Sequence, residues 1–157
     1  MALDATARES NYRDSVRKYL IDNLYTGENI KLLFDKFAPT PDVRDYSIDR
    51  WVSIMFKPLE RGHISEGIID VIPCTRKDTE GFRLAQLTDT VYGYLTDSSA
   101  NDGMRRIPLY RSKAAGSWDV IGGGIMFHEI IESEQLETDT EVKFKVLTVT
   151  LKFASKV

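Results

Sequence analysis

The last third of the chain contains two long runs rich in β-branched and aromatic residues, Val120–Ile131 and Val142–Phe153. Both are longer than a usual strand of about five or six residues. A polar segment, residues 132–141, separates them, and this layout predicts an antiparallel hairpin with a wide connection. Strands of this length either curve around a core or project beyond it. The rest of the fold has to be built around an antiparallel sheet.

Two amphipathic segments are predicted to form helices. Apolar residues recur in them at three- and four-residue steps, at Tyr12, Val16, Tyr19, Leu20 and Leu24 and at Leu84, Leu87, Val91, Tyr94 and Leu95. Thr6 and Glu9 have the spacing of a capping box at the start of the first helix, and Gly27 predicts its end. The second helix is predicted from about Phe82 to Thr96. Each helix therefore presents one apolar stripe to a core.

Further strands are predicted at Asn29–Asp35, Asp49–Phe56, Gly67–Thr75 and Arg106–Tyr110. Both faces of the second are mostly apolar, which predicts an internal strand covered on both sides. Pro73 cannot donate a hydrogen bond to a neighbouring strand, so it predicts a sheet edge or a strand end. Helices combined with a mostly antiparallel sheet make the expected fold class α+β, with two amphipathic helices and a long C-terminal β-hairpin. No linker or repeat divides the chain, so residues 1–157 are expected to form a single domain.

Charge and composition exclude several classes of function. The formal net charge is −3, which does not favour a basic surface for binding nucleic acid. The single cysteine cannot form an internal disulfide and suits a reducing compartment. No apolar run approaches the ~20 residues that cross a bilayer, and the first residues lack the layout of a signal peptide. We therefore expect a soluble protein of a cytosol-like compartment with no membrane partner.

Only Cys74, His63 and His128 could form a nucleophile–base pair. A small cytosolic enzyme using Cys74 and His128 is therefore one alternative function, and a standalone binding module is another. However, no family motif surrounds Cys74, and it is more typical of a small buried residue on a strand. The wide separation of these three residues fits no known zinc-ligand spacing. We expect no catalytic residue, no metal and no cofactor.

Gly122, Gly123 and Gly124 form the one glycine cluster of the chain. It is no phosphate-binding loop, because no Lys-Ser/Thr follows and the sequence continues into a strand. Two interpretations stay open: a β-bulge, or a strand kept bare so that another backbone can approach. Together with Val149 and Leu151 on the final strand, these glycines are candidates for pairing between subunits.

The connection between the two long runs is acidic, and a basic cluster precedes the first run. The acidic residues are Glu132, Glu134, Glu137, Asp139 and Glu141, and the basic ones are Arg105, Arg106, Arg111 and Lys113. An acidic run of this kind is typical of a solvated hairpin tip. It could also dock basic residues of a neighbouring subunit or repel DNA. Complementary patches on one chain suit a head-to-tail ring, so Arg105, Arg106, Glu137, Asp139 and Glu141 are further interface candidates.

Taken together, residues from about Ser10 to Phe153 resemble the tail terminator proteins of long-tailed bacteriophages. The resemblance rests on the helix at Arg13–Leu20, the strand at Asp49–Ile54, the strand, polar turn and helix from Ile72 to Leu95, and the strands at Ile107–Tyr110 and Leu147–Leu151. It is one of element order and hydrophobic pattern, and it transfers no fixed functional residue.

The resemblance implies a homo-oligomer, a hexameric ring that caps the tail tube and ends its polymerisation. Its partners would be the tail tube protein, the neck or connector protein and, in a contractile tail, the sheath protein. DNA would pass through the lumen without specific binding. The protein would assemble in the host cytoplasm and end in the virion at the junction of tail and neck, with no active site and no cofactor. Another neck or tail-completion ring protein is the main alternative within virion assembly.

Overall fold

The computed structural model describes residues 9–35, 49–100, 102–114, 117–139 and 141–154, with the backbone alone at 111–114, 117, 119 and 121–123. The predicted capping residue Thr6 lies outside the described residues. In chain order the elements are α1 (Glu9–Leu20), the π-helix η1 (Ile21–Gly27), β1 (Lys31–Phe34), β2 (Arg50–Phe56), β3 (Ile64–Arg76), α2 (Phe82–Leu95), β4 (Arg106–Ala114), β5 (Ser117–Glu132), β6 (Leu136–Glu137), β7 (Val142–Phe144) and β8 (Leu147–Ala154). The first helical segment ends at Gly27, as predicted.

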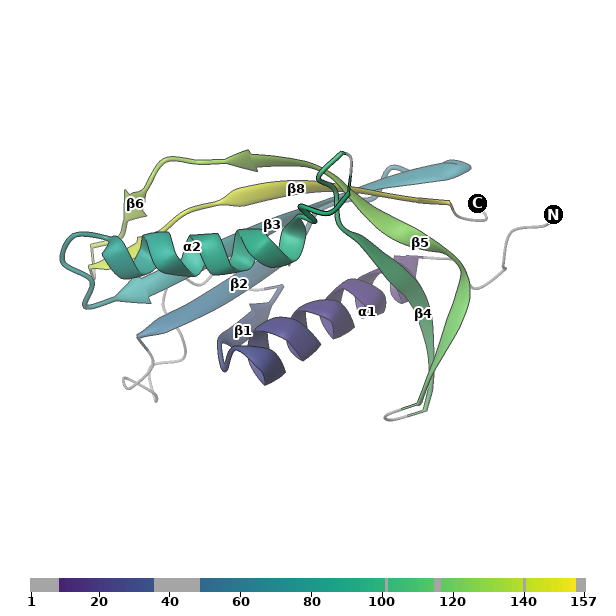
Figure 1. Ribbon diagram of the computed structural model, residues 1–157, viewed down its shortest axis with the longest axis horizontal. Helices are drawn as coiled ribbons and strands as arrows, with labels where there is room; N and C mark the ends of the chain where they lie inside the picture. Colours follow the sequence, from purple (N-terminus) through teal and green to yellow (C-terminus); the bar gives the residue numbers. More distant parts are fainter. Residues whose placement is uncertain (1–8, 36–48, 101, 115–116, 140, 155–157) are drawn as a thin grey trace.

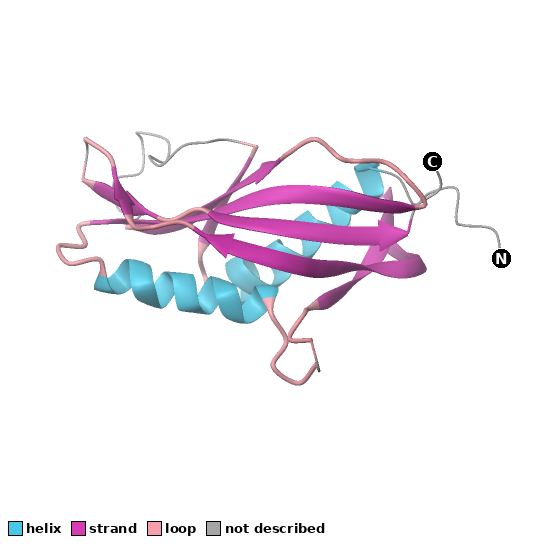
Figure 2. Cartoon of the chain, turned by 90° about the horizontal axis from the view of Figure 1, so that it is seen from above, coloured by secondary structure: helices cyan, strands magenta, loops and turns pink. Residues whose placement is uncertain are grey.

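The strands form one curled sheet in the order β1-β2-β3-β8-β5-β4, with β7 pairing β3 and β6 pairing β7. β1 runs parallel to β2, and every other pairing between the named strands is antiparallel. The long strands run side by side with both helices against them (Figures 1 and 2). The α+β fold class is confirmed.

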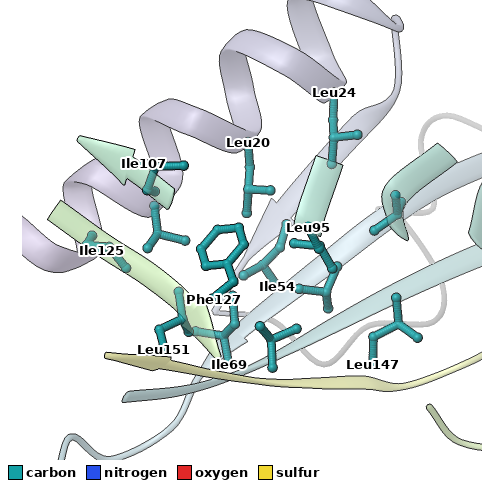
Figure 3. Packing of buried hydrophobic residues seen from close by; sticks show 14 of the residues in the cluster. Leu20, Leu24, Ile54, Ile69, Leu95, Ile107, Ile125, Phe127, Leu147 and Leu151 are labelled. Carbon is teal, nitrogen blue, oxygen red and sulfur yellow. The ribbon is translucent and has the colours of Figure 1, made fainter. Parts of the chain in front are cut away.

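A main cluster of buried side chains joins both helices to one face of the sheet. Its members include Val16 and Leu20 of α1, Leu87 and Val91 of α2, and alternate residues of the strands. Phe127 of β5 points into this cluster between Leu20 and the strand residues Ile69 and Leu151 (Figure 3). The apolar stripes of the two helices thus pack as their three- and four-residue spacing predicts.

β2 is buried on both faces, as predicted. Val52 and Ile54 belong to the main cluster. Trp51 lies in a second cluster on the opposite face, together with Ile72, Cys74, Val142 and Phe144. The near-continuous apolar sequence of β2 therefore reflects two separate packing surfaces.

The prediction of an edge or strand end at Pro73 is wrong, because β3 continues to Arg76 and Pro73 pairs with Val52 of β2. On its other side, however, the ladder is interrupted. β8 pairs with β3 only as far as Val71, and β7 begins to pair at Cys74. The Pro73 carbonyl accepts a hydrogen bond from the Lys145 amide at 3.2 Å. Proline has no N–H to donate, and this gap in the hydrogen bonding lies opposite the break between β7 and β8.

The predicted C-terminal hairpin exists between β5 and β8, but its second run is split into β7 and β8. Val142 and Phe144 face the second cluster, whereas Leu147 and Val149 face the main cluster. Even- and odd-numbered residues face opposite sides of a strand, so this alternation continues across the break, and the register with β3 is also unchanged from Val71–Leu147 to Cys74–Phe144. β4 is also longer than predicted and forms a second hairpin with β5.

Asp78, 7% exposed, holds the first turn of α2. Its Oδ2 accepts hydrogen bonds from the Leu84 amide at 2.8 Å and the Thr75 hydroxyl at 3.0 Å, and its Oδ1 accepts one from the Arg83 amide at 3.3 Å. Desolvation alone would raise the pKa of Asp78, but these hydrogen bonds outweigh it and lower the pKa. The carboxylate therefore satisfies helix amides that have no partner within the helix.

Replacing Asp78→Ala is expected to lower the free energy of unfolding by about 1–2 kcal/mol, because a helix cap is lost. Asp78→Asn keeps an acceptor oxygen and should lose less. Because the folded-state pKa is depressed, the carboxylate stabilises the fold above its unfolded pKa of ~3.9 and loses that effect as pH falls through the folded pKa. Urea unfolding at neutral and acid pH checks this. If the difference in free energy of unfolding between the parent and Asp78→Ala were the same at acid as at neutral pH, the stabilising role of the carboxylate would be contradicted.

Candidate subunit interface

The hairpin of β4 and β5 extends beyond the rest of the sheet. β5 pairs with β8 only from Ile125 onward, whereas its first half, Ser117–Gly124, pairs with β4. We call residues 108–114 and 117–124 the arm. Figure 1 shows it projecting from the sheet beside α1. Leu109 at its base belongs to the main cluster, and the surface beyond this residue is available to a second molecule.

The glycine cluster lies at a β-bulge in the arm. Pro108 pairs with Gly124 and Leu109 with Ile121, so Gly122 and Gly123 fall in a shift of register. A Cβ on Gly124 would lie 3.0 Å from the Ile107 carbonyl oxygen, which is tighter than ordinary contact. The β-bulge interpretation is confirmed, and it bends the strand where the arm leaves the sheet.

α1 closes the outer edge of β4. The Tyr110 amide donates a 2.7 Å hydrogen bond to Oγ of Ser15, a fully buried residue of α1. The same Oγ lies 2.6 Å from the Asn11 carbonyl oxygen and 3.3 Å from that of Tyr110. Pro108, two residues earlier, has no N–H to offer. Two successive outward positions of β4 are thus blocked against pairing with another strand.

A cluster of rings and one cation also holds the arm against α1. The Tyr110 and Trp118 rings meet edge to face with centroids 6.2 Å apart. Lys18 Nζ lies 5.2 Å from the Tyr110 centroid and 5.8 Å from that of Trp118. Val120 on the same strand is 67% exposed. The arm is therefore fixed on one side and presents an apolar side chain to solvent.

The acidic connection is partly neutralised by lysines of its own chain. Lys145 Nζ lies 2.8 Å from Glu132, and Lys143 Nζ lies 3.3 Å from Glu137. Asp139 and Glu141 are exposed. These two residues are thus better candidates for contact with a neighbour than Glu137.

The basic candidates make contacts within the chain. The Arg106 guanidinium pairs with Asp102 at 2.8 Å, and this hydrogen bond lowers the pKa of Asp102. Arg105 donates to the Gly93 carbonyl at 3.0 Å, in the last turn of α2, where a cation interacts favourably with the helix dipole. Arg105 therefore stabilises the end of α2, and Arg106 remains an exposed member of the candidate interface.

The prediction that Val149 and Leu151 pair between subunits is wrong. Both are fully buried in the main cluster. β8 is hydrogen-bonded to β3 on one side and to β5 on the other, so it offers no edge along these residues. Val149 and Leu151 belong to the core.

Comparison with known proteins gives the fold and no family. No family model matches the sequence, and no curated protein matches it. Nine chains of solved structures match. One of them, which carries no functional name, superposes with a TM-score of 0.62 over 96% of this chain and 98% of its own length. The identity is 8%, so this likeness shows the fold alone.

The residues considered for catalysis lie in different environments. Cys74 is fully buried, its Sγ lies 3.4 Å from the Ile72 carbonyl oxygen, and burial raises the pKa of the thiol. His63 and His128 are both exposed. A nucleophilic cysteine has to be accessible and ionised, so this environment disfavours the enzyme alternative.

Within the described part of the chain, no three potential metal ligands lie together. No helix there is long and apolar enough to span a membrane.

Three residues that shape this surface are absent from the candidates that the sequence indicates: Ser15, Pro108 and Tyr110. Two features of the sequence point to Ser15 and Pro108. A serine on the apolar side of the first helix needs a polar partner, and a proline within a strand favours an edge position. The bond between residues 15 and 110 itself links distant parts of the chain, and no local pattern predicts it.

Proposed function

We propose that this chain is a structural virion protein that forms a hexameric ring, caps the phage tail tube, ends its polymerisation and joins the tail to the neck. One face of the ring binds the last ring of the tail tube protein. The opposite face receives the neck or connector protein. A net charge of −3 suits a lumen through which DNA passes without being gripped by its phosphates.

The projecting arm is the observation that carries this proposal. It lies at one end of the molecule, and the acidic connection around β6 lies at the other (Figure 1). Asp139 and Glu141 follow β6. Different surfaces at opposite ends of one chain favour a head-to-tail contact, and such contacts close into rings when the rotation permits. The sequence resemblance to tail terminators supports the same assembly.

The mass of the purified chain under native conditions tests the ring. We expect a particle of six chains, formed by the protein alone or on contact with isolated tail tubes. A neck or tail-completion protein could also form a ring, and tail length in a mutant virus separates the two functions. A chain that stays monomeric both alone and with tube ends would overturn the proposal.

Reversing two acidic charges, Asp139→Lys with Glu141→Lys, is expected to weaken association between chains by roughly tenfold and leave the monomer folded. Both residues are exposed, and hairpin tips contribute little burial. Added salt should weaken association of the parent, because exposed charges are screened beyond about 8–10 Å. Sedimentation at low and high salt measures both effects. The matched control reverses Glu60 and Glu129, which are exposed on other elements of the chain. If the two double variants weakened association equally, the acidic connection would be only a solvated hairpin tip and not part of an interface.

A further inference from the structure

We propose that the edge of β5 that faces away from β4 along Ser117–Gly124 pairs with β1 of a neighbouring copy of this chain, so that the sheet continues from one subunit to the next. This inference rests on the proposed ring and names the strands that build it. Two observations carry it: which backbone groups of the arm point outward, and what the opposite end of the sheet presents.

The direction of the backbone groups follows from the contact with Ser15. The N–H and C=O of Tyr110 face Ser15, so they point away from β5. Tyr110 is opposite Val120 in an antiparallel pair. Opposite residues in such a pair either bond each other or both point outward. The N–H and C=O of Val120, and those of Trp118 two residues before, therefore point away from β4, and no strand that the structure describes pairs with them.

The two edges of the arm differ in how far they are blocked against pairing with another strand. The edge of β4 is blocked by Pro108 and by the contact of Tyr110 with Ser15. The edge of β5 contains no proline, and three of its residues are glycines with no side chain to obstruct a neighbour. Its exposed Val120 adds an apolar contact. Proteins block sheet edges against unwanted pairing, so an edge left unblocked beside a blocked one is suited to a partner.

β1 supplies a matching edge at the other end of the sheet order. It pairs with β2 on one side, and the Asp35 amide donates to the Ile54 carbonyl at 2.8 Å. Alternate residues of a strand point their backbone groups to opposite sides, so those of Leu32 and Phe34 point away from β2. An open pocket of about 290 Å³ adjoins this edge, lined by Ile21, Tyr25, Lys31, Leu32 and Phe34. Its mainly apolar lining suits the exposed side chain of Val120.

The charges of the two strands are complementary. Lys31 is the only charged residue of β1, and Asp119 is the only one between Ser117 and Gly124. In an antiparallel pairing with Val120 opposite Leu32, Trp118 is opposite Phe34, so all four outward-facing residues form hydrogen-bonded pairs. The same register sets Lys31 diagonal to Asp119, a separation within reach of a long side chain. A contact between two different edges, β5 of one subunit and β1 of the next, is a head-to-tail contact, and a ring requires contacts of this kind.

Disulfide trapping tests this register. Hydrogen-bonded partners have Cα atoms about 5.5 Å apart, within the range of a disulfide. The variant Val120→Cys with Leu32→Cys, treated with a mild oxidant, should form covalent oligomers up to the hexamer on a non-reducing gel. Val120→Cys with Leu33→Cys is the matched control, because the side chain of Leu33 lies on the opposite face of the sheet from that of Leu32, and it should crosslink far less. Cys74 is buried and should not interfere.

Each result of this experiment decides a separate question. Rings that form without crosslinks would overturn the strand pairing and leave the proposed function standing. Disulfide dimers of Val120→Cys alone would show that two β5 edges pair with each other and would overturn the choice of β1. A parent chain that forms no ring would overturn the proposed function itself.

Removing one backbone donor gives an independent measurement. Val120→Pro deletes an N–H that faces away from β4, so the arm keeps its own ladder, and association should weaken at least tenfold. Val120→Thr keeps the N–H and should associate nearly as the parent does. Equal association of the proline and threonine variants, with native circular dichroism for both, would contradict pairing at this edge.

Discussion

Tails of uncontrolled length, without attached heads, are the expected product of a virus that lacks this chain. A tube grows by repeating one head-to-tail contact, and an open contact of that kind does not end by itself. Ending it requires a protein that matches the tube end on one face and offers no further tube site on the other. Electron micrographs of lysates from the mutant virus measure the distribution of tail lengths.

Two outcomes of this experiment would contradict the proposal in different ways. Tails of normal length that lack only heads would assign the chain to the neck side of the junction. Normal virions would exclude any part in assembly. Supplying the chain from a plasmid is the control, and it should restore both tail length and head attachment.

The largest effect on stability is expected for Gly67→Ala, at about 1–3 kcal/mol, because it overpacks the core. A Cβ at Gly67 would lie 2.4 Å from the Tyr12 hydroxyl oxygen. Tyr12 cannot move aside easily, since its ring stacks on Phe153 with centroids 4.9 Å apart and meets Phe56 edge to face. Denaturant unfolding of the purified variant measures the loss.

Tyr12→Phe gives a sharp control for this prediction. The buried Tyr12 hydroxyl has no hydrogen-bond partner among the described residues, and desolvation raises the pKa of its phenol. Removing the hydroxyl should therefore cost nothing or stabilise the fold by about 1 kcal/mol. It also removes the nearest clashing atom, although Cζ of the ring would still lie 2.7 Å from the new Cβ, so the double variant should lose somewhat less than Gly67→Ala alone. Strictly additive effects would contradict the proposed clash.

The elements that the sequence predicts well are those whose pattern is local. Both helices and the internal strand β2 follow from the spacing of their apolar residues. Val149 and Leu151 show the limit of such patterns. An alternating apolar stripe has the same sequence whether it faces the chain's own core or a neighbouring subunit, so their burial depends on the strands on either side.

The arm depends on contacts between distant segments. The glycine cluster indicated a bulge as one of two interpretations, but the length of β4 and its closure by Ser15 depend on α1 lying beside Tyr110. Pro73 is a similar case: its effect on the ladder was predicted, but the strand passes through it because β2 pairs on the other side. Tertiary context of this kind overrides local preference.

Addition of the purified chain to growing tail tubes tests the central claim most directly. Tube protein is allowed to polymerise with and without this chain, and tube lengths and ends are imaged by electron microscopy. We expect six-fold rings at one end of the tubes and shorter tubes as the ratio of this chain to tube protein rises. The arm variant Val120→Pro should reduce both effects. Tubes of unchanged length, with no added density at either end, would contradict the proposed function.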